Sequence, residues 1–166
     1  MRFLIFVVCL CLAYLAAAQT PPQTKLEDDG GVAEFRDRII YETIAWRDLF
    51  EQVKLVSSQQ AVLLRNKGRA SGLYAFWEWK SPPGASETEQ ESLLSCRKAA
   101  QGARYAMNDY TELLLNRQLN QPVVEWEEKY RLSLSTYTRE WPKCERAFPD
   151  AAKAMKKAYA KTPIRP

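Results

Sequence analysis

The sequence predicts an all-α protein, a bundle of four to five helices. Three observations carry this prediction. Apolar residues recur every three to four positions over long stretches, prolines and helix-capping residues separate those stretches, and two cysteines lie at nearly equal distances from one predicted turn. Residues 32–166 are expected to form a single helical domain, because that length suits one hydrophobic core.

Residues 1–18 have the features of a signal peptide. A short positive start precedes an unbroken apolar run over residues 3–15, and three alanines supply the small residues that a signal peptidase requires. The run is too short for a membrane anchor, and no second run of that kind follows. We therefore expect a secreted, extracellular protein with no transmembrane segment, with an uncleaved anchor as the alternative. Residues 19–31, rich in proline, glycine and acidic residues, are expected to form a flexible tether.

The first predicted helix, over residues 32–64, is long, and the others are expected to lie along it. Eight of ten positions spaced three or four apart are apolar, and the ten form one seam: Val32, Phe35, Ile39, Glu42, Trp46, Leu49, Val53, Val56, Gln60 and Leu63. The spacing continues to Trp77, with a bend or break expected between Asn66 and Gly72 because each glycine weakens a helix by up to about 1 kcal/mol. The Ser-Pro-Pro-Gly sequence at residues 81–84 must end the helix.

The second helix is predicted over residues 86–119. Ser86 and Glu89 have the spacing of a capping box, in which two side chains satisfy free backbone N–H groups at the start of a helix. Its seam is apolar throughout and small in the middle, so a partner helix should approach closely: Leu93, Cys96, Ala100, Ala103, Met107, Tyr110 and Leu114.

The third helix is predicted over residues 123–141, with Pro122 as a first helical residue and Pro142 as its end. Cys96 lies 25 residues before Gln121 and Cys144 lies 23 residues after it, so the cysteines meet if the second and third helices are antiparallel. These are the two cysteines left without the signal peptide, and in an oxidising compartment they most simply form one disulfide. The bridge should close the helix pair and stabilise the fold by about 4 kcal/mol.

A short basic helix is predicted from residue 148 to just before Thr162. Residues 142–166 carry seven basic and two acidic residues, a net charge of +5, whereas residues 19–141 have a net charge of −2. Four lysines gather on one flank of this helix, and they are a candidate surface for polyanions, anionic lipid or an acidic protein: Lys153, Lys156, Lys157 and Lys161. Lysines near a helix C-terminus also complement the helix dipole, which is the alternative explanation.

Trp77 and Trp79 form a second candidate interaction surface. Residues two apart on a helix point about 200° away from each other, so both indole rings cannot face one core. An exposed tryptophan is a favoured anchor at a protein interface. The alternative is that both are core residues at a helix end covered on two sides.

Several function classes are disfavoured by composition. The chain has no histidine, which removes the usual general base, the triads that depend on imidazole and most zinc sites. A disulfide would also occupy both remaining thiols, and no motif indicates a cofactor. We expect a protein that is not an enzyme, with no catalytic, metal or cofactor-binding residues. Nucleic acid is a poor candidate partner, since basic and aromatic residues are not interleaved.

The layout of the chain resembles the small secreted salivary proteins of mosquitoes and other blood-feeding insects, especially tryptophan-containing families of about this size. The resemblance rests on the signal peptide, the small helical domain, one cysteine pair, the basic tail and five tryptophans: Trp46, Trp77, Trp79, Trp126 and Trp141. It implies a salivary-type antagonist of a host protein or polyanion. Our leading hypothesis is thus a secreted binding protein, and the alternative is a carrier of a small hydrophobic ligand within the helical bundle.

Overall fold

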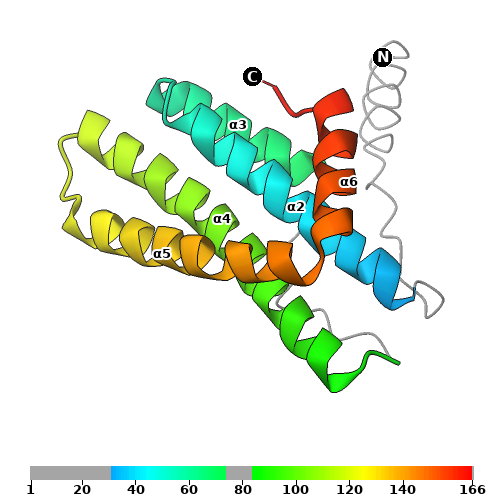
Figure 1. The fold of residues 1–166 in the computed structure, drawn as a ribbon. Helices are drawn as coiled ribbons and strands as arrows, with labels where there is room; N and C mark the ends of the chain where they lie inside the picture. The colour runs from blue at the N-terminus through cyan, green and yellow to red at the C-terminus, as the bar shows by residue number, and fades with distance from the viewer. Residues whose placement is uncertain (1–30, 74–83, 166) are drawn as a thin grey trace, which may run out of the picture.

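The computed structural model describes residues 31–73 and 84–165. Every regular element in these residues is a helix: α2 (Val32–Val53), α3 (Ser58–Ala70), α4 (Glu87–Gln118), α5 (Val124–Ala147) and α6 (Pro149–Lys161) (Figure 1). The prediction of an all-α bundle is therefore confirmed. The proposed signal peptide, residues 19–30 of the proposed tether, and Trp77 and Trp79 lie outside the described residues.

Helix α2 lies between the other helices and contacts α3, α4 and α6 (Figure 1). The predicted apolar seam is present along α2, where five of its positions are almost completely buried: Phe35, Ile39, Trp46, Leu49 and Val53. Two clusters of buried side chains continue from this seam. One joins α2 to α4, α5 and α6 around the disulfide, and the other joins α2 to α3, α4 and α6 around Trp46.

The prediction of one continuous helix over residues 32–64 is wrong, because the chain turns between Val53 and Ser58. Ser57 caps α3 in a capping box. Its hydroxyl accepts a hydrogen bond from the Gln60 backbone at 3.4 Å, and the Gln60 side chain accepts one from the Ser57 backbone at 3.3 Å. Gln60 is thus an exposed cap residue and not part of a buried seam. The break expected between residues 66 and 72 is present as the end of α3 at Ala70, where Gly72 has a φ of 73°.

Glu42, the other polar position of the predicted seam, is fully buried. Its carboxylate accepts a hydrogen bond at 2.9 Å from Nε of Arg38, one turn earlier on α2. The guanidinium of Arg38 also donates to the Gly72 carbonyl at 3.2 Å. A buried carboxylate requires such a partner, and here the partner also ties α2 to the end of α3.

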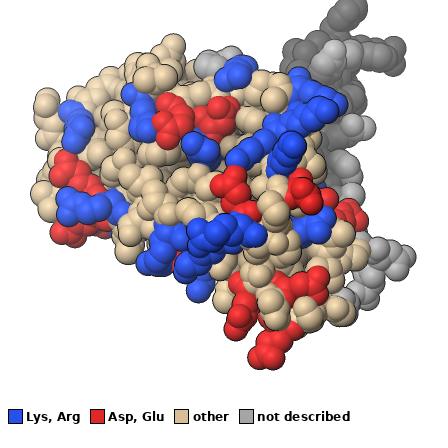
Figure 2. Space-filling model, viewed as in Figure 1, with Lys and Arg blue, Asp and Glu red and all other residues tan. Residues whose placement is uncertain are grey.

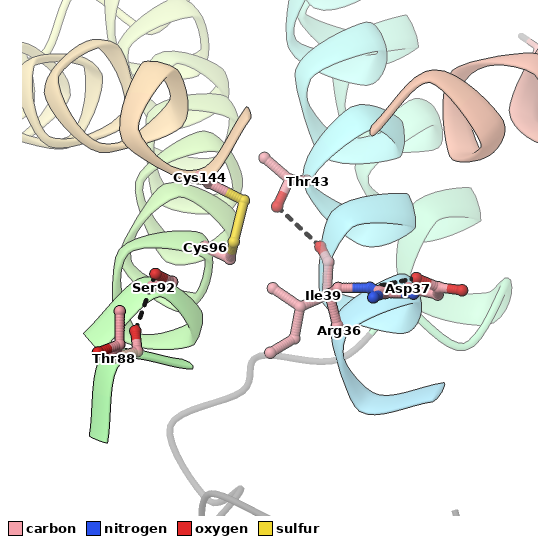
Figure 3. The surroundings of a disulfide bond; sticks show 8 residues. All are labelled: Arg36, Asp37, Ile39, Thr43, Thr88, Ser92, Cys96 and Cys144. Carbon is pink, nitrogen blue, oxygen red and sulfur yellow. Dashed lines mark hydrogen bonds and ion pairs between the residues drawn. A yellow bond between two sulfur atoms is a disulfide. The ribbon is translucent and has the colours of Figure 1, made fainter. Parts of the chain in front are cut away.

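Helices α4 and α5 form the antiparallel pair that the cysteine spacing predicted (Figure 1). Cys96 and Cys144 form a disulfide, with Cα atoms 4.7 Å apart (Figure 3). The two helices are the third and fourth of the five described, and not the second and third, because the predicted first helix is divided into α2 and α3. Helix α4 begins with the expected capping box of Ser86 and Glu89 and ends at Gln118.

The prediction that Pro142 ends the third helix is wrong, since α5 continues to Ala147 with Pro142 in its interior. An interior proline costs about 3 kcal/mol. Trp141 is buried and Cys144 is covalently attached to α4, so the chain is held on both sides of the proline. At the other end, Pro122 precedes the helix and is not its first residue, because Val123 is the N-cap.

Helices α4 and α5 are in close backbone contact at Gly102. A Cβ atom at this position would lie 2.6 Å from the backbone nitrogen of Tyr137 and 3.0 Å from the carbonyl oxygen of Ser133. Both are backbone atoms of α5, so the helices would have to move apart to make room. The contact that requires a small residue is therefore at Gly102, which lies next to Ala103 but is not part of the predicted seam.

Replacing Gly102 with alanine should destabilise the protein by up to about 2 kcal/mol. Overpacking costs about 1–3 kcal/mol, whereas the higher helix propensity of alanine returns at most about 1 kcal/mol. The free energy of unfolding in urea measures the change. Lys98→Ala, at an exposed position of α4, is the control and should change it by less than about 0.5 kcal/mol. A stabilised Gly102→Ala variant would contradict the tight contact.

Stability should also fall in alkali because of Tyr137, on α5. Burial raises the pKa of this tyrosine to about 12, from an ordinary value of 10. Between pH 10 and about 12 the unfolded chain ionises this group while the folded protein keeps it protonated, so the free energy of unfolding decreases as pH rises through that window. Urea titrations at several pH values should show a shallower decrease for Tyr137→Phe than for the wild type. Equal slopes for the two proteins would show that Tyr137 makes no such contribution.

Candidate functional site: the basic face of α6

Helix α6 begins and ends where its sequence predicts. Pro149 occupies the first turn, where a missing backbone N–H costs nothing, and Asp150 complements the positive end of the helix. The residues on its inner side are mostly small, and Ala151 and Ala152 are buried, so the helix lies close to the bundle. Met155 packs against the cluster around the disulfide.

Tyr159 fixes the far end of α6 to α2. Its hydroxyl donates a hydrogen bond of 2.8 Å to Oδ2 of Asp48 and accepts one of 3.2 Å from the backbone of Ile164. Gln52 donates to the same Asp48 oxygen at 2.8 Å and to the Ile164 carbonyl at 2.9 Å. Burial, and then the hydrogen bond to Asp48, raise the pKa of Tyr159. These bonds determine which side of α6 faces outward.

Three of the four predicted lysines form a row on that outward side. Lys153, Lys157 and Lys161 are spaced four residues apart and are all exposed, so the row is about 12 Å long. Within the described residues, none of the three forms an ion pair with an acidic side chain. Figure 2 shows a band of basic side chains over α6. We refer to Lys153, Lys157 and Lys161 as the lysine row.

Lys156, the fourth predicted lysine, has a different environment. It forms an ion pair with Glu145 of α5, and its ammonium lies 5.8 Å from the ring centroid of Trp141. The sequence spacing placed Lys156 with the others, but it is turned toward α5. It is therefore less available to a partner than the lysine row.

Sequence reasoning did not place Lys67 near this surface. Its ammonium, on α3, donates a hydrogen bond of 2.9 Å to the backbone carbonyl of Arg165, which follows α6. The Arg165 guanidinium in turn lies 3.9 Å from Asp48. Lys67 thus adds a basic residue beside the C-terminal end of α6. A separation of 98 residues leaves no local sequence signal for this contact.

The remaining predicted site residues are placed as follows. Cys96 and Cys144 are fully buried in a disulfide and are structural. The candidate surface of Trp77 and Trp79 lies outside the described residues. Aromatic side chains predicted to fill or line a ligand cavity include Trp46, which is buried in the core. A solvent-open cleft of about 280 Å³ lies between α4 and α5, and the carrier alternative stays a prediction.

The described residues contain neither a group of potential metal ligands nor a helix that could cross a membrane. In residues 31–73 and 84–165, histidine, cysteine, aspartate and glutamate do not gather in groups of three or more that could hold a metal ion. None of the helices described is both long and apolar enough to cross a membrane.

No protein-family model, no curated protein and no solved structure matches the chain.

Removing the Tyr159 hydroxyl should loosen α6. Tyr159→Phe is expected to lower the free energy of unfolding by about 1–3 kcal/mol, because the partly buried Asp48 carboxylate and the Ile164 backbone each lose a hydrogen-bond partner. Amide hydrogen exchange should accelerate selectively in residues 159–165. Tyr41→Phe is the matched control, since the Tyr41 ring contacts that of Tyr159 with centroids 5.7 Å apart. Equal effects of the two variants would contradict the role of the hydroxyl.

Proposed function

We propose that this protein is a secreted, non-enzymatic binding protein whose lysine row binds an extracellular polyanion. The observation that carries the proposal is the set of three exposed ammonium groups, Lys153, Lys157 and Lys161, none of which is paired with an acidic group of the described residues. Three other basic residues near α6 have partners: Lys156 pairs with Glu145, Lys67 donates to the Arg165 carbonyl, and Arg165 lies 3.9 Å from Asp48. The row is thus the part of this face with the most charge to offer a partner.

The chemistry of the row suits a polymer with repeated anionic groups. Lysine ammonium groups are point charges on flexible stems, so they contact sulfate or carboxylate groups without demanding a fixed geometry. Their regular spacing along one helix follows an extended anionic chain. A sulfated polysaccharide such as heparan sulfate has this chemistry, and an anionic lipid surface or an acidic face of a host protein shares its charge.

The biological setting that we propose is salivary secretion, with the protein acting as an antagonist of a host polyanion or of the host proteins that bind to it. The signal-peptide features and the general layout of the chain support this setting. A polyanion that recruits host proteins would lose those proteins when its sulfate groups are covered by the lysine row.

Heparin binding tests the proposal directly. The variant Lys153→Gln, Lys157→Gln, Lys161→Gln should bind heparin about 10- to 100-fold more weakly than the wild type at low salt, since each exposed charge contact contributes up to about 1 kcal/mol. Isothermal titration calorimetry at two salt concentrations gives the affinity and its salt dependence, which should also decrease in the variant.

The charge control removes three positive charges elsewhere, Lys54→Gln, Lys98→Gln and Lys129→Gln, of which Lys54 and Lys129 are paired with Glu51 and Glu125. It should retain most of the heparin affinity, and so should Lys156→Gln, because Lys156 is paired with Glu145. If the wild type does not bind heparin, the proposal is wrong. If the control triple variant loses as much affinity as the row variant, net charge and not the lysine row is responsible. A row variant that loses stability but not heparin affinity would indicate that the lysines only complement the helix dipole.

A further inference from the structure

The cleft between α4 and α5 lies beside the turn that joins these helices. It has a volume of about 280 Å³ and is lined by residues of both helices: Tyr110, Leu113, Arg117, Glu127, Tyr130, Arg131 and Leu134. Spacings of three, four and seven residues place each set on one side of its helix. The cleft is therefore built by the antiparallel pair and is separate from α6.

Aromatic rings dominate one part of the cleft. The rings of Tyr110 and Tyr130 lie with centroids 5.2 Å apart, and Phe50 of α2 lies 6.1 Å and 6.0 Å from them, respectively. Both tyrosines are half-buried and line the cleft, so a molecule that enters the cleft can contact them. Together with Leu113 and Leu134, the two tyrosines form an apolar surface on which a flat aromatic molecule could stack.

The charged residues of the cleft are not equivalent. Arg117 and Glu127 pair with each other across the two helices, with Nη2 and Oε1 2.8 Å apart. Arg131 is exposed and forms no ion pair with an acidic side chain of the described residues. A molecule entering the cleft therefore meets tyrosine rings and one guanidinium that is open to an anion.

We propose that this cleft binds a small aromatic monocarboxylate, with its ring system against Tyr110 and Tyr130 and its carboxylate paired with Arg131. Guanidinium and carboxylate groups match in a two-point hydrogen-bonded pair. The volume of about 280 Å³ is just below the usual range for ligand sites, roughly 300–1,000 Å³, so a molecule of one or two rings fits better than a long-chain lipid.

Binding of indole-3-acetate, measured by calorimetry and by saturation-transfer NMR, tests this proposal on the whole secreted chain. The wild type should bind it about tenfold more tightly than neutral 3-methylindole and should discriminate against cationic tryptamine, because Arg131 attracts a carboxylate and repels an ammonium group. Octanoate, which has the carboxylate but no ring, should bind more weakly than indole-3-acetate.

Arg131→Gln should remove the preference for the carboxylate and lower the affinity for indole-3-acetate about tenfold, while binding of 3-methylindole stays unchanged. Arg146→Gln, an exposed arginine farther along α5, is the matched control and should bind as the wild type does. A second variant, Leu134→Trp, should fill the cleft and weaken both ligands.

The proposal is overturned if the wild type binds none of these molecules, or if Arg131→Gln and Arg146→Gln have the same effect. Equal binding of all four probes would also overturn it, because the contacts would then be non-specific. Heparin affinity should not change in Arg131→Gln, so failure of this site and failure of the lysine row can be distinguished.

Discussion

The arrangement of α2, α3 and α4 depends on the burial of one side chain, Trp46. Only 1% of its surface is exposed. Helix α3 reaches it through Gly68, where a Cβ atom would lie 2.8 Å from the indole ring, and Arg104 of α4 lies 5.8 Å from the ring centroid. A large ring can be covered this closely only if the facing helix has no side chain at the contact. The position of α3 against α2 therefore depends on both Gly68 and Trp46. Once α3 is folded back over Trp46, α2 is left with one side for α4 and another for α6.

The features that sequence reasoning predicted well are those set by local rules. The capping box at Ser86, the limits of α6 and the pairing of Cys96 with Cys144 each follow from nearby residues or from spacing about one turn. The break after Val53 was missed although Ser57 and Gln60 carry the same capping signal, because the apolar spacing runs on across the turn and favoured one helix. Pro142 shows the opposite case, in which a strong local rule yields to tertiary packing and a covalent bridge.

The site could be predicted only in part, and the reason is orientation. Sequence spacing identifies which lysines share a side of α6, but the outward direction of that side is set by Tyr159 and its partner Asp48, which are 111 residues apart. The same limit explains why Lys156 was wrongly grouped with the lysine row. Its orientation depends on Glu145 and Trp141 of the preceding helix. The cleft between α4 and α5 was not predicted at all, because it depends on the register of two antiparallel helices and not on a motif.

Helix capping and the proposed binding function impose related demands on charge. Acidic residues near the start of α4, among them Glu87 and Glu89, complement the positive end of that helix, and hydrogen bonds from Ser86 lower the pKa of Glu89. Figure 2 shows a group of acidic side chains at its lower edge, where Figure 1 places the start of α4, and the basic band over α6 lies above this group. Each group of charges has a local role in its own helix, and the two groups lie apart on the face of the molecule that Figure 2 shows. Under the proposed function, a polyanion would be repelled by the first and attracted by the second, so rules that stabilise single helices would also orient the whole protein on its partner.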